Sequence, residues 1–304
     1  MHLVRYHSPV HGPRVGVREG DRLTPLPGVD IMAQLPRLGA TELRDVVDNA
    51  LRGDAGDDAG LVRFLPPLDG RGEVWCAGVT YERSRGARME ETTEQSVYDR
   101  VYTAERPELF LKAPAWRVVT DGEPIGIRSD SGHDVPEPEL AVVVNRHAQI
   151  VGYTVCDDVS SRSIEGENPL YIPQAKVFAG GCALATGVRP AWEVPDPRDL
   201  TITLTVRRAG ATAFEGTTST GQLVRTLADL VTPLCAANDF PDGVVLATGT
   251  GIVPEMDFTL MAGDLVDIDI ERVGRLTNPV TVGKEPFAWL SAGPDARPEL
   301  EEAR

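Results

Sequence analysis

The chain has 304 residues, a formal net charge of −16 at neutral pH and 41% hydrophobic residues. This length is enough to bury a large core, and the ordinary apolar fraction excludes a wholly disordered chain. The excess of acidic residues argues against a nucleic-acid surface, because such a surface requires a basic stripe.

The N-terminal sequence and the cysteines indicate a cytoplasmic protein without a membrane partner. The sequence begins MHLVRYHSPVHG, which is not a signal-peptide pattern, and no apolar run reaches the ~18 residues of a membrane span. The four cysteines are far apart, so they fit neither a zinc ribbon nor a dense disulfide framework. Buried, reduced thiols are typical of the cytoplasm.

Residues 1–70 are expected to form a small N-terminal α+β domain. The runs HLVRYH and RVGVREGDRLTPL predict strands, and the second run contains a turn at Glu19–Gly20–Asp21. Apolar residues at helical spacing in TELRDVVDNALRG predict a helix that ends at Gly53. Residues 71–304 then form the main domain.

The main domain is predicted to be rich in β-strands. Short runs with many β-branched residues predict strands at EVWCAGV, ELFLKA, ELAVVVN, QIVGYTVC, LTITLTV, GVVLATG and DLVDIDIERV. One later helix is predicted at TLADLVTPLCAAN, and the polar stretch 81–94 is expected to be a surface helix or a mobile lid. These elements predict an α+β, β-rich fold, with a mixed β-sandwich or roll as its body.

Two glutamates, Glu137 and Glu139, stand just before the apolar run ELAVVV. Residues two apart in an extended chain point to the same side, so the two carboxylates aim at one place. The following run, IVGYTVCDD, predicts an antiparallel hairpin with its turn near His147. To within a residue or two of that register, Glu137 faces Asp158 and Glu139 lies near Cys156. Glu137, Glu139 and either Asp157 or Asp158 are therefore expected to converge at the open end of the hairpin.

Three converging carboxylates repel one another unless a cation or protons intervene. Hard oxygen ligands of this kind suit Mg²⁺, with Mn²⁺ or Ca²⁺ as substitutes. The alternative is that these acids are solvated side chains at a strand end.

Two further stretches supply candidate ligand-binding residues. The connection after Asp158 carries many polar side chains in a mostly unpatterned loop, which is more typical of a site than of a packing element. The glycine-rich turn in LATGTGIVP either wraps a small ligand or simply turns the chain.

The sequence resembles the fumarylacetoacetate hydrolase family over roughly residues 74–282. The resemblance rests on motifs that follow one another in a fixed order: E-x-E on a strand, GYTVCDDVSSR, a lysine, TGTG and GDLVDIDIERVGRLTNPV. The resemblance implies that Glu137, Glu139 and Asp158 bind Mg²⁺. It also implies that Lys176 holds the substrate or polarises its carbonyl group. The implied fold is a mixed β-sandwich roll behind a small N-terminal domain, and the implied assembly is a homodimer or homotetramer.

The sequence departs from the hydrolases of this family at one motif. Those hydrolases carry N-Y-x-x-H, whose histidine helps to activate water. Here the stretch is VTYERSRGAR, so Tyr81 is present and Ser84 stands at the histidine position. His133 and His147 lie elsewhere and are expected to be surface residues. Hydrolysis therefore lacks an evident general base.

The stretches RPELFLKA and SIEGENPLYIPQAK resemble the branch of the family that converts 2-keto-3-deoxy-D-arabinonate to 2,5-dioxopentanoate and water. The resemblance implies a Mg²⁺-dependent hydro-lyase that acts on a small 2-keto acid through an enolate stabilised by the metal. Glu108 and Lys176 are the candidate catalytic residues. The candidate substrate-binding residues are Tyr81, Arg162, Glu165, Asn168, Tyr171 and Thr250.

Two other functions stay open at this point. One is Mg²⁺-dependent hydrolysis or decarboxylation of an acylpyruvate-like β-diketo acid. The other is a metal-stabilised binding or scaffold protein without turnover. Lys112, in the strand FLK, is either an ion-pair partner or a substrate contact.

Overall fold

The computed structural model describes residues 1–53, 56–84, 86, 100–293 and 297. Most of the stretch 81–94, expected as a surface helix or lid, lies outside these residues. Within the described part of the chain, no helix is both long and apolar enough to cross a membrane.

The strands are β1 (His2–Ser8), β2 (Gly12–Glu19), β3 (Arg22–Pro25), β4 (Asp57–Asp58), β5 (Arg63–Leu65), β6 (Glu73–Gly78), β7 (Glu108–Pro114), β8 (Val119–Thr120), β9 (Ile125–Ile127), β10 (Asp134–Val135), β11 (Pro138–Val144), β12 (Ile150–Asp158), β13 (Ser160–Ser161), β14 (Cys182–Leu184), β15 (Gly187–Pro190), β16 (Thr201–Arg208), β17 (Ala211–Ser219), β18 (Val244–Ala247), β19 (Leu265–Ile270) and β20 (Gly274–Val282). The α-helices are α1 (Ala40–Ala50), α4 (Arg162–Glu167), α5 (Ile172–Lys176), α6 (Leu227–Cys235) and α7 (Ala288–Ala292). Short 3-10 helices lie at Met32–Arg37, Ala59–Leu61, Ala115–Arg117, Pro169–Tyr171, Ala191–Glu193, Thr220–Gln222 and Glu285–Phe287.

The N-terminal segment contains the strands and the helix that the sequence predicts. β1, β2 and β3 form an antiparallel meander, and the turn between β2 and β3 falls at Gly20 and Asp21. Helix α1 buries Leu43 and Val47 against the same core cluster as Leu3 of β1 and Val15 of β2. β1 also pairs with β15, so one sheet runs from this segment into the rest of the chain. The boundary near residue 70 stays a prediction.

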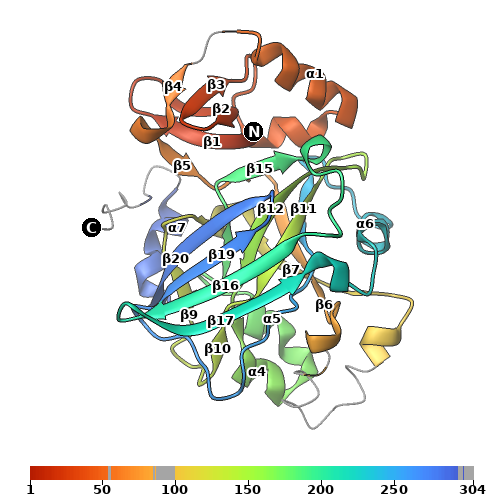
Figure 1. Cartoon of the computed structure of the whole chain (residues 1–304), viewed down its shortest axis with the longest axis vertical. Helices are drawn as coiled ribbons and strands as arrows, with labels where there is room; N and C mark the ends of the chain where they lie inside the picture. The colour runs from red at the N-terminus through yellow and green to blue at the C-terminus, as the bar shows by residue number, and fades with distance from the viewer. Residues whose placement is uncertain (54–55, 85, 87–99, 294–296, 298–304) are drawn as a thin grey trace.

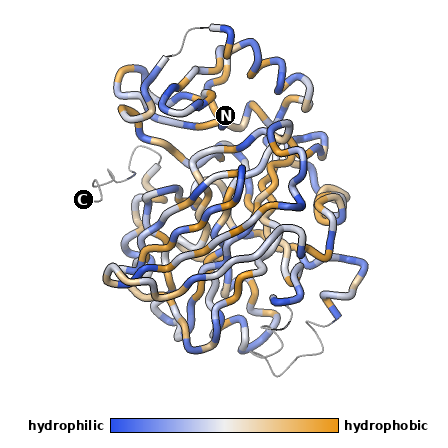
Figure 2. Tube along the Cα trace, viewed as in Figure 1, coloured by the Kyte–Doolittle hydropathy of each residue, from blue (hydrophilic) through white to orange (hydrophobic). Residues whose placement is uncertain are grey.

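The main body packs two sheets against each other, which confirms the β-rich fold. The larger sheet contains β15, β12, β11, β18, β6 and β7 in spatial order, and the smaller contains β17, β16, β19, β20 and β9. Leu140 and Val142 of β11 belong to the same core cluster as Leu204 of β16 and Ile268 of β19. Figures 1 and 2 show these strands crossing, with apolar segments running through the centre of the molecule.

β11 is buried along its whole length because both of its faces are covered. Leu140 and Val142 point into the core between the two sheets, whereas Ala141 and Val143 pack into the cluster that includes α1. A strand covered on both faces has no polar alternation, which explains the continuous run ELAVVV.

The hairpin of β11 and β12 has the predicted register. Glu139 pairs with Cys156, and Pro138 pairs with Asp157. The amide of Asp158 donates to the carbonyl oxygen of Glu137 at 3.0 Å. The hairpin therefore brings its two acidic ends together.

The sequence missed several elements that lack a strong periodic signal. The connection after Asp158 is not a plain loop, because it forms β13, α4, a 3-10 helix and α5. Helices of five or six residues are too short to show a 3.6-residue period. β17 was also missed, because it is a largely exposed edge strand without apolar alternation.

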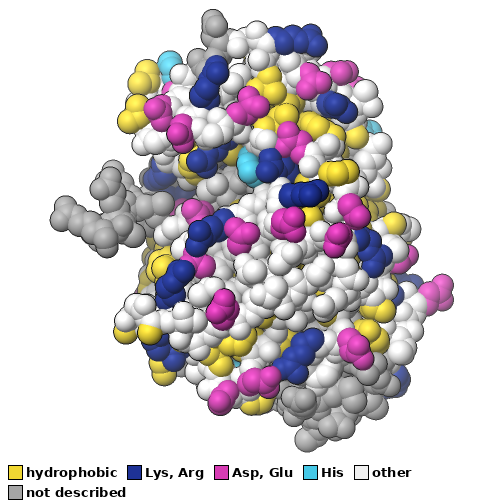
Figure 3. Space-filling model, in the orientation of Figure 1, with side chains coloured by type: hydrophobic (Ala, Val, Ile, Leu, Met, Phe, Trp, Pro, Cys, Tyr) yellow, Lys and Arg dark blue, Asp and Glu magenta, His cyan; other side chains and the backbone are white. Residues whose placement is uncertain are grey.

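Charged side chains of both signs share the surface. On the face shown in Figure 3, acidic and basic side chains are interspersed. Part of the acidity is paired: Asp267 of β19 forms ion pairs with Arg207 and Arg275.

Asp242 joins three separate segments through hydrogen bonds. It lies two residues before β18 and is 3% exposed. Its carboxylate accepts from Arg37 Nε at 3.1 Å, and from the backbone amide and the guanidinium of Arg71 at 3.1 and 3.2 Å. These hydrogen bonds, those of Arg71 first, lower the pKa of Asp242 to about 2.

We predict that Asp242→Asn lowers the stability of the protein. Because both arginines are partly exposed and water screens the ion pairs, the loss should be about 1–2 kcal/mol, or a few degrees in the midpoint of thermal unfolding. The folded-state pKa lies below the unfolded value, so the stabilisation is present above pH ~4 and is lost as the pH falls toward 2. Melting curves at pH 7 and pH 2.5 measure this difference.

The control is Asp239→Asn, which removes an exposed acid. An equal effect of the two substitutions at pH 7 would contradict the prediction.

Candidate active site

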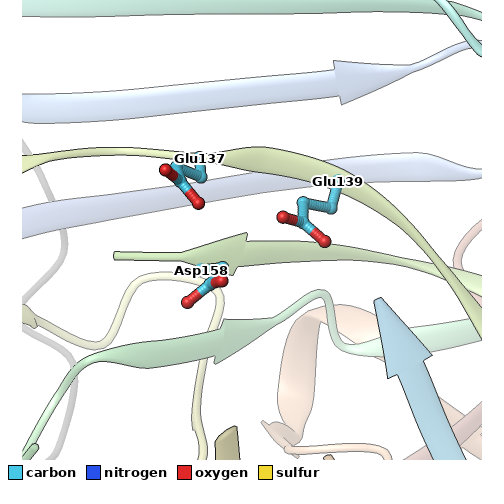
Figure 4. A group of neighbouring side chains, drawn as sticks. All are labelled: Glu137, Glu139 and Asp158. Atoms are coloured by element: carbon cyan, nitrogen blue, oxygen red, sulfur yellow. The ribbon is translucent and has the colours of Figure 1, made fainter. Parts of the chain in front are cut away.

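The three predicted metal ligands lie together at the open end of the hairpin (Figure 4). Glu137 precedes β11, Glu139 is in β11, and Asp158 is the last residue of β12. One carboxylate oxygen of each lies within 4.8 Å of the others. Their exposed fractions are only 3%, 2% and 1%, so the alternative of solvated acids at a strand end is wrong.

Basic side chains from other elements surround two of the three acids. The Lys176 ammonium, at the end of α5, lies 2.5 Å from Glu137 Oε2 and 3.0 Å from Asp158 Oδ2. Lys112 Nζ, from β7, lies 2.5 Å from Asp158 Oδ1. Arg162, the first residue of α4, donates to Glu137 Oε1 at 2.8 Å. Buried charges require partners of this kind, because each unpaired charge costs several kcal/mol.

Lys112 is an ion-pair partner in this structure. Besides Asp158, its ammonium donates to the carbonyl oxygens of Lys176 and Val159, at 2.6 and 2.9 Å. Its side chain is fully buried. Lys112 therefore fixes both a carboxylate of the cluster and the backbone that carries Lys176.

Glu139 accepts a hydrogen bond from a backbone amide, whereas basic side chains contact Glu137 and Asp158. Gly249 N donates to Glu139 Oε2 at 2.7 Å. Burial, followed by the charges of Asp158 and Glu137, raises the pKa of Glu139 well above its usual range. Gly249 has a φ of +94°, and a Cβ there would collide with the Thr80 hydroxyl. The glycine of the TGTG turn is thus needed for this contact.

Asp157 is a neighbour of the cluster. Its Oδ1 accepts from the backbone amide of Glu137 at 2.9 Å. Burial raises the pKa of Asp157 to about 7. The carboxyl group holds the chain at the entrance to β11 and lies outside the group of ligand oxygens.

β7 forms one wall of the site through residues that share a face. Glu108 and Phe110 are two apart in the strand, so their side chains point the same way, and the pairing of β7 with β6 is irregular at Lys112. Lys112 reaches Asp158, and the Phe110 ring centroid is 5.7 Å from Lys176 Nζ. Glu108 begins the strand, and its carboxyl group occupies the space that a Cβ on Gly78 would take.

A small cavity brings most of the candidate residues together. Its lining contains Glu108, Glu137, Glu139, Asp158, Glu165, Lys176 and Thr250. Arg162 lies behind it, against Glu137. The other lining residues include Ser84 and Phe110.

Besides Arg162, three candidates for substrate binding do not line this cavity in the structure. Tyr81 is 1% exposed and packs in the main core, and its hydroxyl has no hydrogen-bond partner among the described residues. The Asn168 side chain accepts from Leu170 N at 3.0 Å and so caps a 3-10 helix. Tyr171 is 38% exposed. A substrate contact for each of the three stays a prediction.

Sequence reasoning missed three contributors to the site. Ser160 accepts a hydrogen bond from Lys176 Nζ at 2.6 Å, Phe110 faces the same ammonium, and Gly249 donates to Glu139. The SSR and TGTG stretches mark two of these positions, but neither stretch identifies a partner.

The cluster fits Mg²⁺ by the chemistry of its donors. Carboxylate oxygens are the ligands that hard divalent cations prefer, and three of them from one small volume can share one ion. Burial first, and then the negative charges of Asp158 and Glu137, raise the pKa of Glu139, so added positive charge would offset the repulsion within the cluster. A divalent cation would supply that charge.

Comparison with known proteins agrees with this geometry. The family model described as fumarylacetoacetate (FAA) hydrolase C-terminal matches residues 73–281. The chain is 48% identical over 229 residues to a probable 2-keto-3-deoxyxylonate dehydratase of Haloferax volcanii, which covers 75% of this chain and 78% of the relative. It is 43% identical over 223 residues to a 2-dehydro-3-deoxy-D-arabinonate dehydratase of Saccharolobus solfataricus, which covers 72% of this chain and 74% of that one.

A solved structure is similar over nearly the whole chain. It is a 2-keto-3-deoxy-D-arabinonate dehydratase complexed with magnesium and 2,5-dioxopentanoate. Its TM-score is 0.80 at 36% identity, and the match covers 93% of this chain and 99% of that chain. The matched family model and these relatives show that the chain belongs to the fumarylacetoacetate hydrolase family.

Proposed function

We propose that the protein is a Mg²⁺-dependent hydro-lyase that converts a 2-keto-3-deoxy sugar acid, such as 2-keto-3-deoxy-D-arabinonate, to 2,5-dioxopentanoate and water. The observation that carries the proposal is the buried cluster of Glu137, Glu139 and Asp158, which shares one cavity with Lys176 and Glu108. Relatives at 43–48% identity are named as dehydratases of such acids, which supports elimination of water over hydrolysis.

Glu137, Glu139 and Asp158 would hold the Mg²⁺ ion. When bound, the ion supplies a Lewis acid that polarises the 2-keto group and stabilises negative charge on its oxygen. The remaining chemistry belongs to side chains that touch the same cavity.

Lys176 would bind the anionic end of the substrate. Its ammonium is held by Glu137, Asp158 and Ser160, so its position is fixed before substrate arrives. Contacts with two carboxylates favour the ammonium over the neutral amine that a Schiff base requires. Lys176 therefore acts through its charge, by stabilising the keto oxygen or the carboxylate of the substrate.

Glu108 would move the protons of the elimination. Enolate formation requires a base at C3, and departure of the C4 hydroxyl requires an acid nearby. One carboxyl group serves both steps, because the proton that it takes from C3 is the one that the leaving hydroxide needs. Lys112, on the same strand, contacts Asp158 and two backbone carbonyl groups. An ion pair with Lys112 is therefore not the main role of Glu108.

The lining of the cavity argues against hydrolysis. Ser84 stands where the hydrolases carry histidine, and its hydroxyl donates to the carbonyl oxygen of Tyr81 at 2.8 Å. His133 contacts the carbonyl oxygen of Phe258, and His147 is exposed in the hairpin turn. Among the described residues, the cavity lining contains no histidine that could activate water.

We further infer a cytoplasmic homodimer or homotetramer that takes only a small-molecule substrate, without a nucleic-acid or membrane partner. Exposed large apolar side chains support self-association: Leu170 is 83% exposed and Trp116 is 53% exposed. Size-exclusion chromatography with light scattering measures the assembly directly.

The deciding experiment offers the purified protein two substrates, with Mg²⁺ and with EDTA. We expect 2-keto-3-deoxy-D-arabinonate to yield 2,5-dioxopentanoate only when Mg²⁺ is present. Cleavage or decarboxylation of an acylpyruvate, without any aldehyde from the sugar acid, would establish the alternative function. Mg²⁺ binding without turnover of either compound would establish a binding protein.

We predict that Glu139→Gln loses Mg²⁺ but keeps its fold. The Gln side chain still accepts the hydrogen bond from Gly249, whereas the charged ligand is gone. The loss of affinity should exceed the ~10–100-fold that is typical of mutations outside the ligand shell. Calorimetric titration with MgCl₂ measures the affinity, and Glu167→Gln on the exposed side of α4 is the control.

Glu137 and Asp158 are poorer choices for substitution. The loss of either carboxylate leaves buried basic side chains without their ion-pair partner, at a cost of about 3–5 kcal/mol. Unchanged Mg²⁺ affinity in Glu139→Gln would remove this residue from the ligand set.

We predict that Glu108→Gln binds Mg²⁺ and pyruvate as the parent does but loses dehydration. A positioned acid–base group contributes ~10²–10⁴-fold in rate, and Gln keeps the size of the side chain without its proton chemistry. Steady-state assays of aldehyde formation measure the loss. Glu105→Gln removes a nearby exposed acid and should have no effect. Turnover by Glu108→Gln within a few-fold of the parent would refute the acid–base role.

A further inference from the structure

Two carboxylic acids in the cavity stand outside the metal cluster. Glu108 comes from β7 and Glu165 comes from α4, and both belong to the cavity lining. The reaction proposed above uses one of them. The second, Glu165, is 1% exposed and lines the same cavity.

The placement of Glu165 follows from Arg162. The two residues are three apart on α4, so their side chains share one face of the helix. Arg162 contacts Glu137 at 2.8 Å, which fixes this face toward the metal cluster. Ser161 caps the helix by accepting from Ile164 N. Glu165 therefore enters the cavity about one turn, or ~4.5 Å along the helix axis, beyond the arginine.

Dehydration to 2,5-dioxopentanoate requires proton transfers at two separate places. First, C3 loses a proton to a base, and the C4 hydroxyl leaves with that proton as water. The product of this half is 5-hydroxy-2-oxopent-3-enoate, with a double bond between C3 and C4. Next, C5 must lose a proton while C3 gains one, which moves the double bond to C4 and C5. Finally, the enol at C5 loses its hydroxyl proton to solvent while C4 gains a proton, and the aldehyde is formed.

These steps balance with two carboxyl groups. Glu108 takes the C3 proton, gives it to the departing hydroxide, and later returns a solvent proton to C3. Glu165 takes the C5 proton and delivers it to C4. One proton enters from solvent at C3 and one leaves from the C5 hydroxyl, so the net change is the loss of one water molecule. No oxidant or reductant is needed.

We propose that Glu165 is the catalytic acid–base group at the C5 end of the substrate, whereas Glu108 serves C3 and C4. The proposal rests on the proposed function. A 2-keto acid anchored at the acid cluster by its first two carbons directs C5 away from that cluster. Glu165 is the cavity carboxyl group carried one helical turn past the residue that contacts the cluster.

The test separates the first half of the reaction from the second. In D₂O with Mg²⁺, 2-oxobutanoate reports exchange at C3 only, because it has neither a C4 hydroxyl nor a C5. With 2-keto-3-deoxy-D-arabinonate, proton NMR distinguishes the vinyl protons of the enone from the aldehyde proton of the product. Mg²⁺ titration confirms that each variant keeps its metal site.

We expect Glu165→Gln to exchange C3 of 2-oxobutanoate within about threefold of the parent. It should form the aldehyde ~10²–10⁴-fold more slowly and accumulate the enone. Glu108→Gln should lose both exchange and enone formation. If Glu165→Gln does not fold, Glu165→Asp keeps the acid but shortens its reach, and slower aldehyde formation with transient enone is then expected.

Aldehyde formation by the Glu165 variant at the parent rate would overturn the proposal. So would equal losses of C3 exchange and aldehyde, since Glu165 would then act in the first half. If the parent exchanges C3 of 2-oxobutanoate but makes no aldehyde from the sugar acid, the proposed function itself fails, and this inference fails with it.

Discussion

The site depends on the balance of charge in one buried cluster. Glu137, Glu139 and Asp158 converge where water is excluded, and like charges at that distance repel strongly. The opposing charges come from β7, α4 and α5, which are separated in sequence from the hairpin that they neutralise. Each of these elements is therefore held against the hairpin by an ion pair as well as by packing. A cluster built in this way is ordered before any ligand binds.

The hairpin and its acids could be predicted because their signals are local. A strand has a side-chain period of two, so Glu137 and Glu139 had to share a side, and the turn near His147 fixed the partner positions. The observed pairing of Glu139 with Cys156 follows from these two facts alone. The strands of the N-terminal segment and helices α1 and α6 were predicted for the same reason, since each carries a clear periodic pattern.

The rest of the site depends on contacts that no local pattern encodes. Lys112 meets Asp158 across 46 residues of chain, and Gly249 meets Glu139 across 110. Short helices such as α4 and α5 are fixed by tertiary packing and by Ser161 at the cap, so their periodicity is too brief to detect. Tyr81 is recognised by its place in a motif, and the motif does not reveal that its side chain packs in the core.

β7 contributes three side chains to the site. Lys112 contacts Asp158, Phe110 faces the Lys176 ammonium, and Glu108 lies in the cavity beside Gly78. In the proposed reaction these side chains supply anchoring charge, apolar cover and proton transfer. The residue at the hydrolase histidine position is Ser84, whose hydroxyl is used by the local turn. The described lining contains no histidine that could activate water, and in the proposed reaction the acids around the cavity direct the chemistry toward the substrate's own hydroxyl group.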